Sequence, residues 1–234
     1  PITNKFTSGL VGYWTFNGAD IDWSTNTAYD RSGQGNNGTI YGAKPAIGKV
    51  GQALEFDGVN DYVDCGNDES LNFASGEGFT FEAWVKTSDD YGPIISFRNS
   101  ADDDPVIDLS IGDNGATTNA GHFIPLMRYD DGSGLEYFSA TADITDNIWH
   151  HVAFVYNPTS QKIYAYIDGA SWELSQTQIG SITTLDYRAI GSEQRWVAQN
   201  FGDSDHRYLN GLIDEVRIYN RALSAEEIAE HYRV

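Results

Sequence analysis

The stretch Gly211–Ile228, GLIDEVRIYNRALSAEEI, decides the fold, because a strand pattern in it runs directly into a helix start. Successive side chains of a strand alternate between two faces. One face of this strand holds Leu212, Asp214, Val216 and Ile218, and the other holds Ile213, Glu215, Arg217 and Tyr219. The first face is mainly aliphatic, so we predict that Asp214 points into the core. A lone carboxylate there costs several kcal/mol unless it is paired, and a bound cation is a strong candidate for its partner.

A helix is predicted directly after this strand. Ser224 and Glu227 have the spacing of a capping box, in which the serine hydroxyl accepts from a first-turn amide and the glutamate reaches back to the serine amide. This pattern predicts a helix of about two turns over Ala225–Tyr232.

The preceding chain consists of short alternating runs separated by Gly, Asn, Asp and Ser. The clearest run is FTFEAWVK, residues 79–86, whose phenylalanines face inward while Glu82 and Trp84 face outward. The other predicted strands cover residues 12–16, 39–41, 53–56, 94–98, 106–111, 123–129, 135–140, 150–156, 162–167, 171–176, 185–191 and 209–219. About a dozen strands and one short helix predict an all-β antiparallel sandwich, as a single domain over residues 1–234.

The charge of the chain excludes several classes of partner. Its 14 Lys and Arg residues against 34 Asp and Glu residues give a formal charge of −20, which repels nucleic acids and anionic membranes and favours cations. Cys65 is the only cysteine, so the chain forms no internal disulfide and no thiolate zinc cluster. No apolar run approaches the roughly 18 residues of a membrane span. The chain starts at Pro1 without a leader, and we expect a domain of a longer protein.

Several pieces of the chain together resemble a known family. They are GYWTFNG at 12–18, DRSGQGNNGTI at 30–40, KVGQALEFDGVNDYV at 49–63, FTFEAWVK at 79–86, NIWHHVAFVYN at 147–157, KIYAYIDG at 162–169 and NGLIDEVRIYNRALSAEEI at 210–228. In this order they resemble the laminin-G-like, concanavalin A-like lectin/glucanase jelly-roll domains. The resemblance implies a jelly-roll sandwich with one short C-terminal helix. Such domains are appended to bacterial carbohydrate-active enzymes, adhesins and surface proteins, where they often bind glycans.

The resemblance also implies a calcium ion that ties the N-terminal region to the last strand. Asp214 would be its central ligand, and Asp30, Asp57 and the carbonyls of residues 32–38 are candidate co-ligands, because calcium takes six to eight hard oxygens. The alternative is that Asp214 pairs with an arginine or accepts backbone amides. A second calcium is possible at the opposite end of the sandwich, where two loops carry Asp102, Asp103, Asp104, Asp130 and Asp131. Acid clusters of this kind are also common as solvated surface.

A candidate glycan site follows from loop placement. If the strands run alternately up and down, the loops at 87–93, 112–121, 141–148 and 192–208 share one end of the sandwich. The longest of them carries an aromatic ring among planar polar groups that suit sugar recognition. The candidate ligand-binding residues are Gln194, Arg195, Trp196, Asp203, Asp205, His206 and Arg207, with His122, Asp113 and Asn114 from a neighbouring loop. The alternative is that Trp196 plugs the end of the core. The outward faces of central strands could also line a groove with Arg98, Arg128, Tyr137 and Arg188.

The sequence offers no catalytic pattern. Jelly-roll glycoside hydrolases need two carboxylates flanking the scissile bond, and no predicted strand carries a Glu-x-Asp-x-Glu arrangement. Asp214 and Glu215 are adjacent and diverge, as do His150 and His151. We therefore predict a non-catalytic, calcium-dependent or calcium-stabilised carbohydrate-binding module of an extracellular or cell-surface protein, an adhesin or a polysaccharide-acting enzyme. Its partner would be a glycan, and the domain would be monomeric. A structural or protein-binding spacer, and a hydrolase or lyase with an unrecognised site, are the alternatives.

Overall fold

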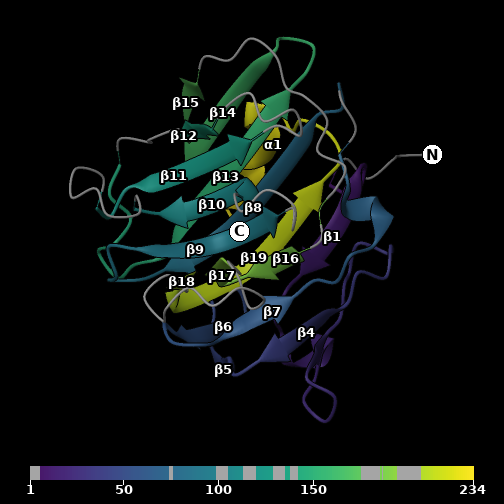
Figure 1. The fold of residues 1–234 in the computed structure, drawn as a ribbon, viewed down its shortest axis with the longest axis vertical. Coiled ribbons are helices and arrows are strands. Elements are labelled where there is room, and N and C mark those ends of the chain that lie inside the picture. Colours follow the sequence, from purple (N-terminus) through teal and green to yellow (C-terminus); the bar gives the residue numbers. More distant parts are fainter. Residues whose placement is uncertain are drawn as a thin grey trace.

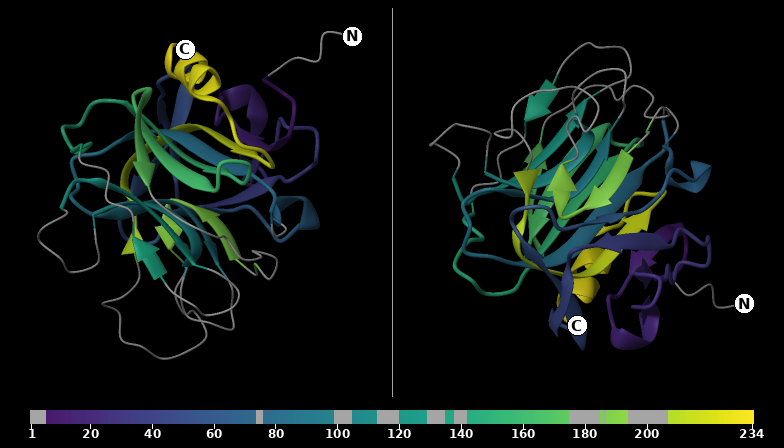
Figure 2. Two further views of the ribbon diagram at one scale, coloured as in Figure 1. Left: turned by 90° about the horizontal axis from the view of Figure 1, so that it is seen from above. Right: turned by 60° about the horizontal axis from the view of Figure 1, so that its bottom comes forward.

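The structure, a computed structural model, describes residues 6–73, 76–98, 105–112, 120–128, 135–137, 142–174, 185, 187–193 and 207–234. Within these residues the chain forms two antiparallel sheets packed face to face, with one helix outside (Figures 1 and 2). The all-β sandwich predicted from the sequence is confirmed. In the described part of the chain, no helix is long and apolar enough to cross a membrane.

The sheet beneath the helix, called here the helix sheet, contains the longest strands. Across the sheet they run β15 (Ala170–Leu174), β14 (Lys162–Ile167), β13 (His150–Asn157), β8 (Phe79–Lys86), β19 (Asn210–Tyr219), β6 (Gln52–Asp57) and β5 (Lys44–Ile47), and β1 (Leu10–Trp14) pairs with β19. The pairing of β1 with β19 ties the N-terminal region directly to the last strand through backbone hydrogen bonds.

The second sheet, called here the front sheet, faces the viewer in Figure 1. Its described strands run β12 (Leu135–Tyr137), β11 (Phe123–Arg128), β10 (Pro105–Ile111), β9 (Gly92–Arg98), β16 (Tyr187–Ile190), β7 (Tyr62–Asp64), β4 (Gly38–Tyr41), β3 (Thr27–Ala28) and β2 (Ile21–Asp22). A two-stranded pair, β17 (Ser192–Glu193) with β18 (Arg207–Tyr208), adjoins it. Two short 3₁₀ turns lie at Gly18–Asp20 and Glu69–Leu71.

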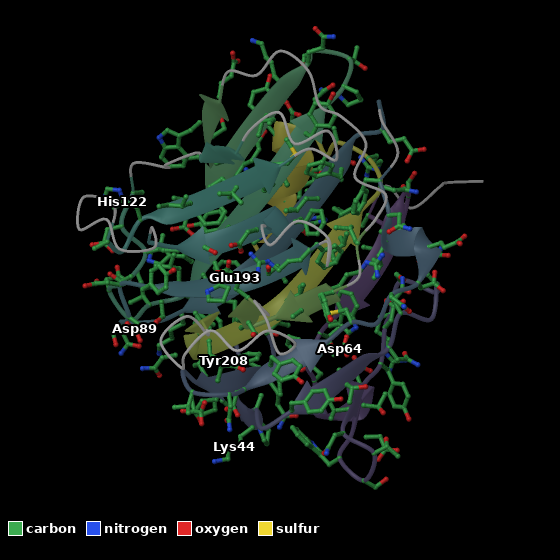
Figure 3. The ribbon with its side chains drawn as sticks, in the orientation of Figure 1. Lys44, Asp64, Asp89, His122, Glu193 and Tyr208 are labelled. Carbon is green, nitrogen blue, oxygen red and sulfur yellow. The ribbon has the colours of Figure 1, made fainter. Side chains whose placement is uncertain are left out.

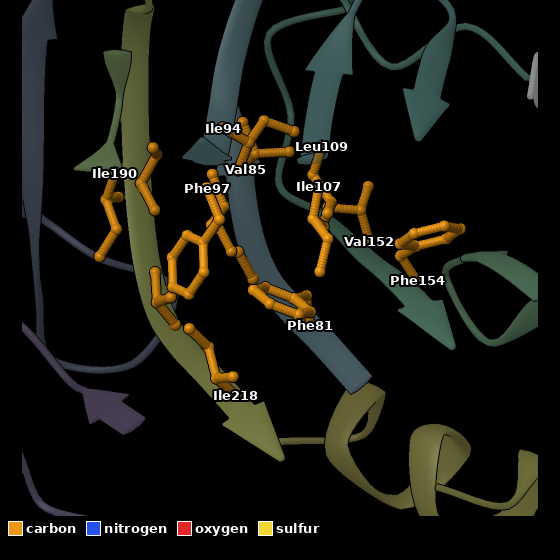
Figure 4. Close-up of a cluster of buried hydrophobic side chains, with 14 of the residues drawn as sticks. Phe81, Val85, Ile94, Phe97, Ile107, Leu109, Val152, Phe154, Ile190 and Ile218 are labelled. Atoms are coloured by element: carbon orange, nitrogen blue, oxygen red, sulfur yellow. The ribbon is translucent and has the colours of Figure 1, made fainter. Parts of the chain in front are cut away.

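The hydrophobic core fills the space between the sheets. The inward positions of β8 and β9 meet there, and the rings of Phe81 and Phe97 lie edge to face with centroids 5.0 Å apart (Figure 4). Both side chains are fully buried. Aromatic pairs of this geometry add stabilisation to that of the buried area alone. The inward alternation predicted for residues 79–86 is therefore confirmed.

β19 contains a β-bulge. Glu82 and Trp84 of β8 are two positions apart, whereas their partners on β19, Arg217 and Asp214, are three positions apart. Glu215 lies between Asp214 and Arg217, in the bulge, and it has a φ of 53°, which is rare outside glycine. The bulge bends β19 at the point where it changes partners.

The bulge changes which residues of β19 face the core. Val216 and Ile218 lie in the core as predicted, but Ile213 takes the inward position before the bulge. The prediction that Leu212 and Asp214 face the core is wrong, because one inserted residue reverses the alternation. Asp214 shares the outer face of the helix sheet with its partner Trp84.

Helix α1 (Ala225–Tyr232) has the predicted bounds and packs on the outer face of the helix sheet (Figure 2). The capping box is confirmed: Ser224 Oγ accepts from the Glu227 amide at 3.3 Å, and Glu227 Oε2 accepts from the Ser224 amide at 2.9 Å. Ile228 and His231 are buried against the sheet. The helix thereby covers outward residues of β8 that the sequence pattern assigns to solvent.

Candidate functional site

Asp214 is completely buried at the outer face of the helix sheet. Its Oδ2 accepts the backbone amide of Val50 at 2.9 Å, and a Cβ on Gly48 would lie only 2.6 Å from that oxygen. Burial raises the pKa of Asp214 to about 7, although the Val50 amide favours the charged form. The partner of Asp214 is thus the turn between β5 and β6, which is the backbone-amide alternative considered from the sequence.

Asp30 organises the glycine-rich loop that follows it. Its Oδ1 accepts the amides of Tyr13 at 2.9 Å and Ser32 at 2.8 Å. Its Oδ2 accepts the Ser32 hydroxyl at 2.6 Å and the amides of Gly35 and Asn36 at 3.0 Å. Five donors therefore already surround the two carboxylate oxygens, and the loop is held by Asp30 itself.

Asp57 belongs to a third, separate network. Its Oδ1 accepts the amides of Val59 at 2.8 Å and Asn60 at 3.2 Å, which closes the turn after β6. Among the described residues, no group of three His, Cys, Asp or Glu side chains is placed to hold a metal ion. The three acids do not share one coordination sphere, so the predicted clasp through Asp214, Asp30 and Asp57 does not fit their geometry. Asp102, Asp104 and Asp131 lie outside the described residues, as do Asp103 and Asp130.

The loops predicted to share one end of the sandwich do meet there in their described parts. The Gly121 amide donates to the Asp90 carbonyl at 3.0 Å, and the Ile144 amide donates to the Gly121 carbonyl at 3.0 Å. Thr87 Oγ1 donates to the Asn210 carbonyl at 2.6 Å, which brings in the strand that follows the longest loop. The up-and-down reading of the strands is therefore correct for the described parts of the loops at 87–93, 112–121 and 141–148.

Of the candidate glycan residues, the structure describes the surroundings of His122 alone. His122 forms an isolated bridge with Asp143, and its carbonyl accepts the Gly112 amide at 2.8 Å. Figure 3 labels it at the edge of the molecule, apart from Tyr208. The side chains of the other candidates lie outside the described residues: Gln194, Arg195, Trp196, Asp203, Asp205, His206, Arg207, Asp113 and Asn114.

The outer face of the front sheet holds a buried ion pair. Arg98 Nη2 lies 2.7 Å from Glu193 Oε1, and the two side chains are only 4% and 2% exposed. Ser96 and Asp108, opposite each other on β9 and β10, are buried on the same face. Outward positions of an antiparallel sheet are usually solvated, whereas these polar side chains are buried. Gly191, with a φ of 79°, lets the chain turn from β16 into β17, which carries Glu193.

Arg188 does not line this face as predicted. Arg188 lies opposite Phe97 where β16 pairs with β9, and Phe97 faces the core. Arg188 therefore also faces inward, and it is only 1% exposed. Its guanidinium donates to the Gly66 carbonyl at 3.2 Å and to Asn72 Oδ1 at 2.6 Å, so it closes one end of the core. Arg98 does lie on the outer face, and the side chains of Arg128 and Tyr137 lie outside the described residues.

Three tyrosines form a strip on the outer face of the front sheet, called here the tyrosine strip. Tyr41 and Tyr62 are partners on β4 and β7, and their rings stack with centroids 4.5 Å apart and an interplanar angle of 13°. Tyr208 of β18 lies next to Tyr62, with ring centroids 6.5 Å apart. Tyr41 is 44% exposed. The strip therefore presents aromatic surface to solvent close to the polar region around Glu193 (Figure 3).

The family model of the Concanavalin A-like lectin/glucanases superfamily matches residues 57–229, about three quarters of the chain. The chain belongs to this superfamily. The resemblance drawn from the sequence motifs is thereby confirmed. No curated protein matches the chain in sequence. The superfamily includes glucanases as well as lectins, so membership leaves the activity open.

Solved structures of the superfamily fold include several binding domains. The binding domain of Paraclostridial Mosquitocidal Protein 1 matches with a TM-score of 0.71 and 18% identity over 97% of this chain and 52% of that chain. Domain 4 of AbnA, an extracellular arabinanase of Geobacillus stearothermophilus solved with arabinotriose, matches with 0.63 and 19% over 95% of this chain and 98% of that domain. The botulinum neurotoxin serotype D ligand-binding domain, solved with N-acetylneuraminic acid, matches with 0.65 and 14% over 97% of this chain and 51% of that chain.

These structural matches confirm the fold. The chain spans about half of the first of these relatives, 52% of its length. It spans nearly all of the arabinanase domain, 98%.

Proposed function

We propose that this chain is a non-catalytic carbohydrate-binding module, and that the tyrosine strip is its sugar-binding surface. The observation that carries the proposal is the stacked, solvent-facing pair Tyr41 and Tyr62 beside Tyr208. Aromatic rings bind the apolar C–H face of a sugar ring, and neighbouring polar groups bond its hydroxyls. The fold shared with sugar-bound domains of an arabinanase and a neurotoxin supports this reading.

The strip suits an extended glycan better than a single sugar. Three neighbouring rings on one sheet face can contact successive sugar units. The module would hold a host protein on an extracellular polysaccharide or a cell-surface glycan, as an adhesin tip or as part of a polysaccharide-acting enzyme.

Two further parts of the proposal come from the sequence alone. The loop around Trp196, with its neighbour His122, would add contacts at the end of the sandwich where the loops meet. Calcium would stabilise the domain or take part in binding; because Asp30 and Asp57 already hold backbone amides, its ligands would include groups other than those two side chains.

The decisive experiment is a glycan array in calcium and again in EDTA, followed by titration of arabinotriose and of the best array ligand. Tyr41→Ala should weaken binding about tenfold, the effect of losing one aromatic contact. Tyr29→Ala is the matched control, because Tyr29 is similarly exposed at 39% and takes no part in the strip. Equal affinities of Tyr41→Ala and the wild type would move the site elsewhere, and Trp196→Ala would then test the loop. Absence of binding to every glycan would leave a spacer domain.

A further inference from the structure

A pocket lies on the opposite side of the sandwich from the tyrosine strip, between α1, β1 and β19. Its volume is about 310 Å³, at the lower end of the range for small-molecule sites. Its principal lining residues are Phe6, Tyr13, Arg31, Arg217, Tyr219 and His231. Aromatic rings and planar polar groups therefore enclose one small space.

Two of the lining residues, Arg217 and His231, belong to a buried charge network around Glu82. Glu82 is fully buried, and its carboxylate lies 2.7 Å from His231 Nδ1, 3.6 Å from His151 Nε2 and 3.6 Å from Arg217 Nη1. The three basic groups come from α1, β13 and β19. Buried charged groups of this kind often stabilise a fold no more than apolar residues of the same volume would, and they concentrate at functional sites.

The polar groups of one wall are held in fixed positions. Tyr13 Oη donates to Glu215 Oε2 at 2.7 Å and accepts from Arg217 Nη2 at 3.0 Å, while Arg217 also pairs with Glu215. The Arg217 guanidinium lies over the Tyr13 ring, 4.5 Å from its centroid. A ligand would meet these groups already ordered, which lowers the entropy cost of binding.

The charge of the pocket selects against an anion. Each arginine of the lining is paired with an acid of the chain: Arg31 with Asp20, and Arg217 with Glu215. No surplus positive charge is left for a ligand carboxylate or phosphate, and the chain as a whole carries −20. An uncharged, hydroxyl-rich ligand can form hydrogen bonds with these polar groups and can contact the aromatic rings with its C–H face.

We propose that this pocket is a second carbohydrate site, which takes a single uncharged sugar ring. Phe6, 41% exposed, and the ring of Tyr13 supply the apolar contacts, and Arg31 and His231 supply hydrogen-bonding groups. The ligand class rests on the proposed function, but the site is independent of the tyrosine strip. The module would then be divalent, with a chain-binding face and a ring-binding pocket.

Amide chemical shifts test this directly. The ¹⁵N-labelled domain is titrated with galactose, glucose, N-acetylglucosamine and arabinose, and separately with N-acetylneuraminic acid as the anionic probe. At least one neutral sugar should shift the amides of Thr7, Leu10 and Tyr13 in a saturable way, and the anionic sugar should shift them less. Shifts at Tyr41 and Tyr62 alone would overturn the pocket and keep the strip. Shifts at the pocket alone would support the pocket, and the strip would still be tested by the extended glycans of the array.

Two variants separate binding from folding. Phe6→Ala should weaken the pocket titration about tenfold, since an exposed ring is removed from its wall. Thr7→Trp should fill the pocket and abolish the shifts at Leu10 and Tyr13. The spectrum away from the pocket reports that each variant is folded. Tyr29→Ala is the control that should bind the neutral sugar as the wild type does, because it removes a ring of similar exposure, 39%, that is not part of the pocket lining. Unchanged affinity in both pocket variants, or shifts with none of the four neutral sugars, would overturn the proposal.

Discussion

At the scale of single residues, Asp214 is the most instructive position. Sequence alternation correctly marks it as a buried acid that needs a partner, because period two and burial are local properties of a strand. The same alternation assigns it to the wrong face, because the bulge at Glu215 depends on how β19 pairs with β8 and leaves no signal in composition. Its partner, the Val50 amide, lies 164 positions away in the chain.

Asp214→Asn should change the pH dependence of stability. The pKa of Asp214 rises to about 7 in the folded protein from an ordinary value of 3.8. A carboxyl with a raised folded pKa favours folding in its protonated form, so its contribution is present below about pH 4 and is lost as the pH rises through 7. Asp214→Asn should therefore gain stability relative to the wild type as the pH rises, and its advantage should be about 2–3 kcal/mol larger at pH 8 than at pH 5.

Urea denaturation at both pH values measures this difference. Asp57→Asn is the control, because Asp57 is exposed and serves its own turn. A variant that is less stable than the wild type by the same amount at both pH values would contradict the raised pKa. A wild type that regains stability at pH 8 on addition of calcium, when the variant does not, would indicate a cation at Asp214.

At the scale of elements, prediction succeeds where the signal is local. The capping box fixes α1 at Ala225–Tyr232, and the alternation of residues 79–86 fixes the faces of β8. Prediction fails where one element covers another. Glu82 and Trp84 point outward as expected, yet they are 0% and 1% exposed. The ring of Trp84 stacks on that of Tyr232 of α1, with centroids 5.7 Å apart. The alternation of side chains within one strand cannot predict this contact between two elements.

His231→Phe should weaken the docking of α1. Although burial opposes it, His231 and His151 hold the pKa of Glu82 below its ordinary value. A carboxyl whose pKa is lowered in the folded state stabilises the fold above its unfolded pKa. This contribution is lost as the pH falls through its folded pKa. Removing His231 leaves Glu82 buried with less compensation, which should cost about 3 kcal/mol at neutral pH.

Hydrogen exchange locates this loss in the helix. Amides of α1 and of Phe79–Lys86 should lose protection first, while β9 and β10 keep theirs. The double variant Glu82→Gln with His231→Phe should recover part of the stability, because no uncompensated charge remains. Equal protection of α1 in His231→Phe and the wild type would show that the Glu82 contact does not hold the helix.

At the scale of the whole molecule, the two candidate surfaces are products of topology. Tyr41, Tyr62 and Tyr208 come from three separate parts of the chain, and only the pairing of β4 with β7 and the position of β18 bring them together. The outward position of Tyr41 and Tyr62 in their short strands was a usable signal, but nothing in the sequence places Tyr208 beside them. The joint order of family motifs, by contrast, predicts the fold itself, because it samples most strands of the helix sheet: β1, β6, β8, β13, β14 and β19.

Calcium removal is the last prediction, and it concerns the whole fold. If calcium is part of the folded domain, a concentration of 100 times its dissociation constant adds about 2.7 kcal/mol. For a domain of this size the melting temperature should then fall by about 5–10 °C in EDTA relative to excess calcium, as followed by calorimetry. Magnesium at equal ionic strength is the control for general screening of the −20 charge.

The size of the shift in melting temperature in variants then locates the ion. Loss of the shift in Asp214→Asn would place it at the last strand, and loss in Asp102→Asn with Asp104→Asn would place it in the acidic loop. Equal melting temperatures in calcium and EDTA would contradict a calcium that a chelator can remove, and the backbone pairing of β1 with β19 would then account for the closure of the sandwich.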